Sequence, residues 1–387
     1  MRVAFYSAQV LENWGGLEKY FVETSTELSS RYPNVSADIV TNGNKFSRKL
    51  DTLFKYYYGG TENSESRREL HENIVGRLTG DVQYFKAESL KELREILLRY
   101  DVIYTKNEIL ELVVLTFLGI KKLRPIVVGC HTALQYPNPK QMKYRLRNRI
   151  YSGMPYQLLC RNIQAIHVLN ESDFEMAEKL SNRVSLIPNP FDVNKFRKLS
   201  EVSSTSEIRV NEQAFNIAWV GRLAEQKGIA ELLELISKYK LQRAGGVQAD
   251  WHIFGDGQYR NEVISAIGTE KDLKYYGYVK GEDLAPVLKR CNLLISTSRW
   301  EGMPYNLLEA VGLGLPVITF DIPGARCIVI DGENGFLVTS IDSFFAKIKF
   351  LITGGSVNQA GCGMQRFDPP TVYQNLYDLL ADAIQPQ

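Results

Sequence analysis

Apolar and polar positions along the chain form two recurring patterns, short continuous apolar runs and longer segments that carry one apolar stripe. Apolar runs bounded by glycine, proline or polar residues are typical of buried strands, and stripes with a period near 3.6 residues are typical of helices. Strands are predicted over 2–7, 37–41, 101–105, 125–130, 163–169, 184–187, 216–220, 251–255, 273–277 and 293–295. Helices are predicted over 89–100, 109–118, 171–180, 229–239, 282–289, 306–311 and 370–384.

The alternation of strands and helices in both halves of the chain is typical of parallel sheets covered by helices on both faces. A length of 387 residues is enough for two domains with a core each. We therefore predict an α/β protein built from two doubly wound, Rossmann-like domains that face each other across a cleft.

Composition and charge narrow the class of protein. A net charge of +2 argues against general nucleic-acid binding, and no apolar run is long enough to predict a membrane-spanning helix. Met1 leads directly into a predicted strand, so no signal peptide is expected. Together with dispersed cysteines, which indicate reduced thiols, these features predict a cytoplasmic protein. The cysteines are Cys130, Cys160, Cys291, Cys327 and Cys362.

Two carboxylates, Glu301 and Glu309, flank a Gly-Met-Pro turn between a predicted strand and a predicted helix. Loops at the carboxyl ends of parallel strands form the ligand crevice of such sheets, and the first turn of a helix favours a phosphate. Carboxylates there suit a ligand with many hydroxyl groups, such as a ribose or a hexose. The alternative interpretation is a helix start with solvated acids.

Arg222 and Lys227 lie five positions apart on another predicted strand-to-helix loop, 221–228. A planar guanidinium and a compact ammonium at this spacing can close on a diphosphate. The alternative is ordinary ion pairing on the surface.

In the first half, Gly15 and Gly16 follow the first strand and precede a helical pattern that runs to Leu28. Glycines there let backbone amides approach a ligand, although a plain strand-to-helix turn has the same sequence. His131 stands at the carboxyl end of the strand 125–130, where the crevice is expected. Its alternative role is that of a polar residue satisfied by its neighbours.

The stretch 301–310, E-G-M-P-Y-N-L-L-E-A, followed by G-L-P-V-I at 314–318, resembles the signature of group 1 (family 4) retaining glycosyltransferases of the GT-B fold. The pattern G-R-L-x-x-x-K-G at 221–228 and D-G-x-N-G-x-L-V at 331–338 agree with it. Residues 187–192 resemble the hinge pattern I-P-N-G-V-D of this family, with Pro190 in place of glycine. Phe320–Gly324 departs from the usual D-x-G-G, and Cys327 stands where glutamate is common.

The resemblance implies a retaining enzyme that moves a hexose from a nucleoside diphosphate sugar, UDP ahead of GDP or ADP, to a hydroxyl of a glycan or lipid-linked acceptor. It implies no bound metal and no cofactor apart from the donor. The acceptor-side domain would span 1–190 and be completed by the C-terminal helix 370–387, and the donor would bind to 191–369. A nucleotide-sugar epimerase and a catalytically silent nucleotide-sugar-binding subunit on the same fold remain as alternatives.

The resemblance also implies a role for each site residue. Arg222 and Lys227 would stabilise the leaving diphosphate, Glu301 would hold hydroxyls of the donor sugar, His131 would position that sugar, and Glu309 would hold the ribose. The other residues expected to line the donor site are Gly15, Gly16, Gly255, Asp256, Gly257, Met303, Pro304, Tyr305, Asn306 and Leu307.

The segment 139–161 carries six basic residues and no acid. Met142, Leu146 and Ile150 recur at helical spacing, so we expect a basic amphipathic helix with an apolar stripe. Three interpretations stay open: peripheral contact with the inner face of an anionic membrane, contact with an anionic acceptor, and a solvated helix face. The basic residues are Lys140, Lys143, Arg145, Arg147, Arg149 and Arg161.

Overall fold

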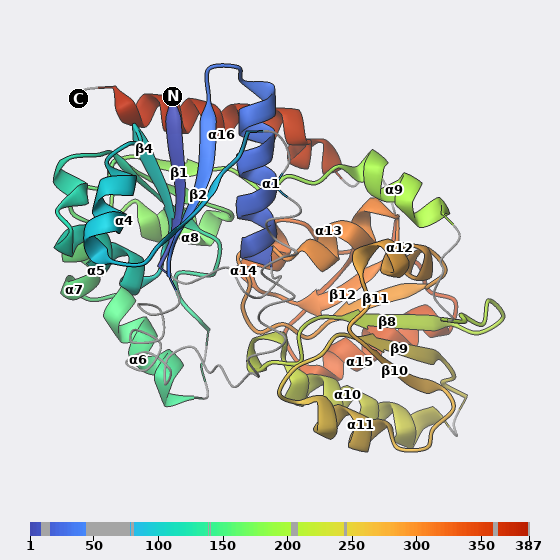
Figure 1. Ribbon diagram of the computed structural model, residues 1–387. Coiled ribbons are helices and arrows are strands. Elements are labelled where there is room, and N and C mark those ends of the chain that lie inside the picture. The colour runs from blue at the N-terminus through green and yellow to red at the C-terminus, as the bar shows by residue number, and fades with distance from the viewer. Residues whose placement is uncertain are drawn as a thin grey trace. The chain divides into compact units, whose positions relative to one another are not determined.

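The computed structural model describes residues 1–8, 16–43, 78, 81–137, 139, 141–202, 208–243, 246–358 and 363–385. The chain divides into two units, each built around its own parallel sheet (Figure 1). The first unit contains Met1–Asn189 together with Pro370–Gln387, and the second contains Pro190–Pro369.

The sheet of the first unit has seven parallel strands in the order β3-β2-β1-β4-β5-β6-β7. Three of these strands, β4, β5 and β6, are buried along their whole length, and β1 and β2 are buried except at their first residue, as expected of strands covered on both faces. Sequence patterns miss β3, a short edge strand in which only the last residue is fully buried. The strands are β1 (Arg2–Ser7), β2 (Ser36–Asn42), β3 (Tyr84–Ala87), β4 (Val102–Lys106), β5 (Ile126–Cys130), β6 (Ala165–Val168) and β7 (Val184–Leu186).

Helices pack on this sheet, and the buried side chains between helices and sheet form two apolar clusters. One cluster lies beneath α4, α5 and α7, and the other lies beneath α1 and α16. The last helix, α16, packs its apolar stripe against β1 (Figure 1). Its Tyr377 stacks on Tyr32 with ring centroids 4.3 Å apart. The helices are α1 (Gly16–Arg31), α4 (Leu90–Leu97), α5 (Ile109–Phe117), η1 (Ile120–Lys122), α6 (Met142–Tyr151), α7 (Met154–Cys160), α8 (Glu171–Ala177) and α16 (Pro369–Ile384).

The sheet of the second unit has six parallel strands in the order β10-β9-β8-β11-β12-β13. They are β8 (Asn216–Val220), β9 (Asp250–Phe254), β10 (Leu273–Gly277), β11 (Leu293–Ser296), β12 (Val317–Phe320) and β13 (Gly335–Val338). The helices are α9 (Val193–Glu201), η2 (Glu225–Lys227), α10 (Ile229–Gln242), α11 (Arg260–Ile267), α12 (Gly281–Lys289), α13 (Tyr305–Gly312), α14 (Pro323–Arg326), α15 (Ile341–Ile352) and η4 (Met364–Phe367). Its core is centred on the buried indoles of Trp219 and Trp251.

Each sheet reverses its strand order once. The first reverses between β1 and β4, and the second between β8 and β11. At such a switch point the loops after the two central strands diverge to opposite faces and leave room for a ligand at the carboxyl edge. The fold therefore singles out the loops that follow β8 and β11.

The basic segment 139–161 departs from its prediction in two respects. It forms two helices, α6 and α7, because Ser152 and Gly153 end the first and Gly153 with Pro155 starts the second. Arg147, expected on a solvated basic face, is 4% exposed. Its guanidinium lies between the rings of Tyr136 and Tyr151, 4.0 and 3.9 Å from their centroids. Lys140 lies outside the described residues.

Among the described residues, no helix has both the length and the apolar character that a membrane crossing requires.

Candidate functional site

The loops at the switch point of the second unit pack against each other through glycines. Gly228, which ends η2, has φ +65°, and a Cβ there would lie 1.8 Å from the backbone oxygen of Thr297 after β11. Gly255 after β9 has φ +129°, and a Cβ there would lie 1.8 Å from the backbone oxygen of Gly221. Only glycine allows these approaches, so three strand-ending loops meet at one edge of the sheet.

Lys227 and Glu301 form an ion pair at the edge where these loops meet, although they are predicted to contact different parts of the ligand. Lys227 Nζ lies 2.5 Å from Glu301 Oε1, and both side chains are mostly buried. Gln226 Nε2 donates to Glu301 Oε2 at 3.2 Å and to the backbone oxygen of Trp300 at 3.2 Å. Both oxygens of the carboxylate therefore accept a hydrogen bond, which holds Glu301 in one orientation.

Arg222 lies on the same loop and is exposed. Its Nη2 lies 3.5 Å from Gln226 Oε1, at the outer limit of a hydrogen bond. The guanidinium is therefore held only loosely, whereas Lys227 is fixed by its partner. The structure brings the two predicted cations together on one short loop, beside Glu301.

Several residues that hold the loop 221–228 in place were not marked by any sequence motif. Trp219 Nε1 donates to Thr297 Oγ1 at 3.0 Å, and Thr297 Oγ1 donates to the backbone oxygen of Lys227 at 2.8 Å. Arg299 Nη2 lies 2.5 Å from Glu231 Oε1, and its Nη1 lies 3.5 Å from Glu225 Oε1. These contacts tie η2 to β8 and to the loop after β11. Gln226 lies inside the x-x-x of the G-R-L-x-x-x-K-G pattern, so only its position on a 3₁₀ turn reveals its role.

The start of α13 places the remaining predicted residues of the 303–309 stretch. Pro304 is the N-cap of α13, and Asn306 Nδ2 donates to the backbone oxygen of Val220 at 2.8 Å. Asn306 Oδ1 is buried and has no hydrogen-bond partner among the residues that the structure describes, so a ligand hydroxyl that reached it could satisfy it. Leu307 is fully buried, and its backbone N–H donates to Pro304, so this leucine serves the core.

Three further predicted residues differ in how far they reach the surface. The side chain of Met303 is 6% exposed, whereas Tyr305 and Glu309 are half-buried. Glu309 lies one helical turn inside α13, and Tyr305 is its first residue. The hydrogen bond of Asn306 thus holds residues 303–309 next to the end of β8. The side chains of this stretch differ in their exposure to solvent.

The loop Gly255, Asp256 and Gly257 joins the same edge. The backbone N–H of Leu223 donates to the Asp256 backbone oxygen at 2.9 Å, and Asp256 Oδ1 accepts from Gly257 N at 2.8 Å. Asp256 and Gly257 are exposed. The backbone of this loop therefore flanks the loop that bears Arg222.

In the first unit, Gly16 is the first residue of α1 and Gly15 lies outside the described residues. His131 directly follows β5, and Arg147 holds its loop by donating to the backbone oxygens of Leu134 at 3.1 Å and Ala133 at 3.3 Å. The His131 ring lies 4.1 Å from that of Tyr20, centroid to centroid. Arg147 therefore supports the loop of a predicted site residue.

A chain of hydrogen bonds fixes the tautomer of His131. His167 Nε2 lies 2.7 Å from the Ile187 backbone oxygen, which can only accept, so Nε2 carries the proton. His167 Nδ1 then accepts from the Tyr104 hydroxyl at 2.7 Å, and the Tyr104 oxygen accepts from His131 Nε2 at 2.8 Å. The Nδ1 lone pair of His131 is thereby left as an acceptor.

Burial keeps the histidines neutral and makes stability depend on pH. Burial lowers the pKa of His131 well below its usual 6.5, and lowers those of His167 and His252 to about 4. Protons then bind the unfolded chain more readily, so the stability present above pH 6.5 is lost as the pH falls toward 4. Each of the two shifts to about 4 corresponds to roughly 3 kcal/mol at most.

We expect the melting temperature to fall between pH 6.5 and 4.5, measured by differential scanning fluorimetry. Glu111 and Asp173 act in the opposite sense, because burial raises their pKa values. The His252→Gln variant isolates the histidine effect, because it should melt lower at pH 7.5 but lose less on acidification than the wild type. Parallel curves for the two proteins would contradict the assignment.

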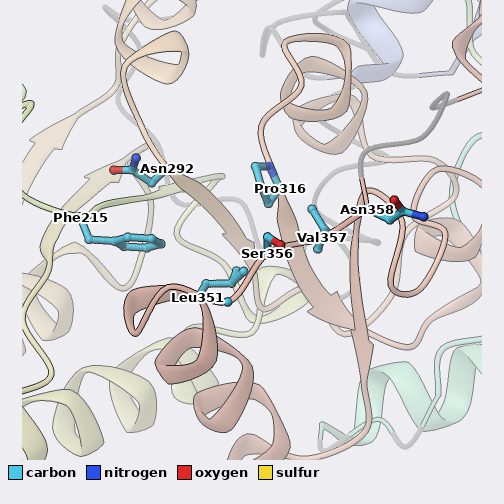
Figure 2. Close-up of a pocket in the computed structure, with 8 residues that line it drawn as sticks. Phe215, Asn292, Pro316, Leu351, Ser356, Val357 and Asn358 are labelled. Carbon is cyan, nitrogen blue, oxygen red and sulfur yellow. The ribbon is translucent and has the colours of Figure 1, made fainter.

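A hollow of about 520 Å³ lies at the other edge of the second sheet (Figure 2). Phe215, Asn292 and Pro316, which line it, directly precede β8, β11 and β12. It therefore lies at the amino ends of the strands, away from Lys227 and Glu301, and has no part in the candidate site. Within the described residues, no group of three or more His, Cys, Asp or Glu side chains could hold a metal ion.

Comparison with known proteins shows similarity to glycosyltransferases. Residues 214–354 match the family model of glycosyl transferases group 1. A UDP-Gal:alpha-D-GlcNAc-diphosphoundecaprenol alpha-1,3-galactosyltransferase of Escherichia coli is 32% identical over 168 residues, which are 42% of this chain and 43% of the relative. The poly(ribitol-phosphate) alpha-N-acetylglucosaminyltransferase of Staphylococcus aureus is 26% identical over 196 residues, 49% of this chain and 35% of the relative. The chain thus matches less than half the length of these curated relatives.

Solved structures resemble nearly the whole chain. The complex of Anabaena HepE with UDP-glucose superposes with a TM-score of 0.66 at 21% identity, covering 99% of this chain and 100% of HepE. The lipopolysaccharide outer core galactosyltransferase WaaB superposes with a TM-score of 0.67 at 17% identity, covering 99% of both chains. These likenesses confirm the predicted GT-B fold.

Proposed function

We propose that this chain is a group 1 glycosyltransferase that moves a hexose from a nucleoside diphosphate sugar to a hydroxyl of a glycan or lipid-linked acceptor. UDP is the favoured nucleotide, transfer proceeds with retention, and side chains rather than a metal neutralise the diphosphate. The complexes of HepE with UDP-glucose and the names of the curated relatives support this choice of donor and acceptor class.

The observation that carries the proposal is the Lys227–Glu301 pair, with Arg222, at the β8–β11 switch point. An ammonium and a guanidinium on one loop suit a diphosphate, and a neighbouring carboxylate suits the hydroxyls of the attached sugar. Lys227 compensates the charge of the mostly buried Glu301. A bound diphosphate would share Lys227 with Glu301, and the loosely held Arg222 would close on it.

The proposed step forms one bond and breaks one. The acceptor oxygen bonds to the anomeric carbon on the face that the diphosphate leaves, the bond from that carbon to the phosphate oxygen breaks, and the acceptor proton passes to the leaving diphosphate. Negative charge therefore develops on the diphosphate. Arg222 and Lys227 stabilise it in the transition state more than in the ground state.

Three other residues have proposed roles in binding. Glu309, one turn inside α13, holds the ribose, and Asn306 Oδ1 accepts a hydrogen bond from the ligand. On the first unit, His131 Nδ1 accepts a hydrogen bond from a hydroxyl of the donor sugar. Tyr104 and His167 act as positioning residues, because they set the tautomer of His131.

Ligand-induced stabilisation tests the donor. At one common concentration of UDP-, GDP- and ADP-sugars, we expect the UDP-sugars to bind most tightly and to raise the melting temperature most, by the equivalent of roughly 2.7 kcal/mol where that concentration is about 100 times the dissociation constant. Glu309→Ala should reduce the shift, whereas Glu333→Ala, on the turn before β13, should not. A wild-type protein that no nucleotide sugar stabilises would exclude the donor site.

Incubating the purified protein with its donor distinguishes a transferase from a silent subunit or an epimerase. A transferase should slowly hydrolyse its donor without acceptor, and the first sugar released should keep the anomeric configuration of the donor, as followed by proton nuclear magnetic resonance. Binding without hydrolysis or transfer would indicate a silent subunit. Conversion of the donor to its epimer would indicate the other enzyme class.

A further inference from the structure

Large apolar side chains are exposed together on the first unit. Met142 and Leu146, two residues of the predicted apolar stripe of α6, are 74% and 49% exposed, whereas Arg147, which follows Leu146, is buried. On α5, Phe117 is 76% exposed, and on α7, Met154 is 71% exposed. Soluble surfaces rarely gather such residues without a partner. The full set in this part of the chain is Val113, Phe117, Leu123, Met142, Leu146, Met154 and Leu158.

These side chains belong to three helices that pack together. α7 packs against both α5 and α6 (Figure 1). α5 buries Leu112 and Leu115, and α7 buries Tyr156 and Cys160, in the same apolar cluster, which also takes Tyr151 at the end of α6. The exposed apolar residues lie on the sides of these three helices that face away from the cluster. We call this surface, formed by the exposed residues of 113–161, the α5–α7 face.

The charged residues of the segment that forms the α5–α7 face have one sign. No aspartate or glutamate occurs between Leu112 and Asn170. Arg145 and Arg149 are exposed on α6, Arg161 follows α7, and Lys122 follows α5. Lys143 is half-buried, with its ammonium over the ring of Tyr144. Within this segment the apolar residues are thus accompanied by cations, and Glu108, the N-cap of α5, accepts from the Tyr151 hydroxyl at 3.0 Å.

We propose that the α5–α7 face docks on an anionic lipid bilayer. Flexible methionines together with Phe and Leu would enter the boundary between headgroups and acyl chains, while Arg145, Arg149 and Arg161 contact lipid phosphates. Docking of two copies through this face would bring like charges together, which disfavours a second copy as the occupant. Only the purpose of docking, access to a lipid-linked acceptor, rests on the proposed function. Binding to the bilayer can be measured without any glycosyl transfer.

Vesicle flotation tests the docking with the full chain. Wild-type protein should float with vesicles of equal phosphatidylglycerol and phosphatidylcholine at low salt, and less at 0.5 M salt because added ions screen the attraction. Arg145→Gln with Arg149→Gln should weaken binding by about thirtyfold, on the scale of two surface charges. Met154→Gln with Leu158→Gln should weaken it by about tenfold or more and keep the salt dependence. All four side chains are exposed, so the melting temperature should not change.

Leu241→Gln is the matched control, because Leu241 is 79% exposed on α10 of the second unit, and this variant should float as the wild type does. Wild-type protein that does not float at low salt, or double variants that float equally well, would overturn the proposal. So would a concentration-dependent dimer that the Met154 and Leu158 changes dissociate, because the occupant would then be a second copy. Nucleotide-sugar stabilisation, measured on the same samples, reports on the proposed function separately.

Discussion

Replacing Lys227 or Arg222 by alanine should lower turnover by roughly two orders of magnitude or more, the scale of lost transition-state charge stabilisation. Arg222 gives the cleaner test, because its exposed side chain has one weak hydrogen bond to Gln226 and its loss should leave the fold intact. Removing Lys227 also leaves Glu301, 7% exposed, without the ammonium 2.5 Å away. We therefore expect Lys227→Ala to lose stability as well as activity.

The measurement is kcat for transfer or for acceptor-free donor hydrolysis, with the melting temperature recorded for each variant. Lys289→Ala is the matched control, since Lys289 is an exposed cation of the same unit that pairs with Glu201 at 3.3 Å. Lys227→Arg keeps the charge but not the compact geometry, so it should restore stability more fully than activity. If the Arg222→Ala variant retained more than half of the wild-type kcat, Arg222 would have no part in the mechanism.

The fold could be predicted from the sequence because parallel strands are buried on both faces. Such strands as Val102–Lys106 and Ile126–Cys130 are apolar along their length and stand out from the polar loops. The edge strand Tyr84–Ala87 could not be found, because it is short and only partly buried. The hydrophobic pattern of the sequence does not predict the order of the strands in each sheet, and that order decides where the switch points lie.

The candidate site was only partly accessible to sequence reasoning. Motifs identify Lys227 and Glu301, but no motif spacing indicates that they pair at 2.5 Å or that Gln226 completes the carboxylate's hydrogen bonds. Those contacts depend on how far two loops, distant in sequence, approach each other. Arg147 shows the converse error, because helical periodicity cannot reveal that two tyrosine rings enclose a guanidinium. The roles assigned to the site residues stay predictions until variants are measured.

Gly228→Ala should be among the most damaging single changes in the second unit. Gly228 has φ +65°, where an L-residue costs roughly 1–2 kcal/mol. The added Cβ would also lie 1.8 Å from the Thr297 backbone oxygen, so η2 must move away from the loop after β11. We expect a loss of roughly 4 kcal/mol or more, the range in which a named steric cause is required. The shift would also separate Lys227 from Glu301 and abolish the stabilisation by nucleotide sugars.

Gly314→Ala separates the two causes, because Gly314 has φ +75° in the same unit but, beyond its chain neighbours, no atom of the described residues lies within 4 Å of its added Cβ. That variant should lose only about 1 kcal/mol, the conformational part of the effect. Chemical denaturation of both variants, followed by tryptophan fluorescence from the buried Trp219 and Trp251, measures the difference. Equal losses would mean that the Thr297 loop yields to the new methyl group, and that the close approach of the two loops does not hold the Lys227–Glu301 pair in place.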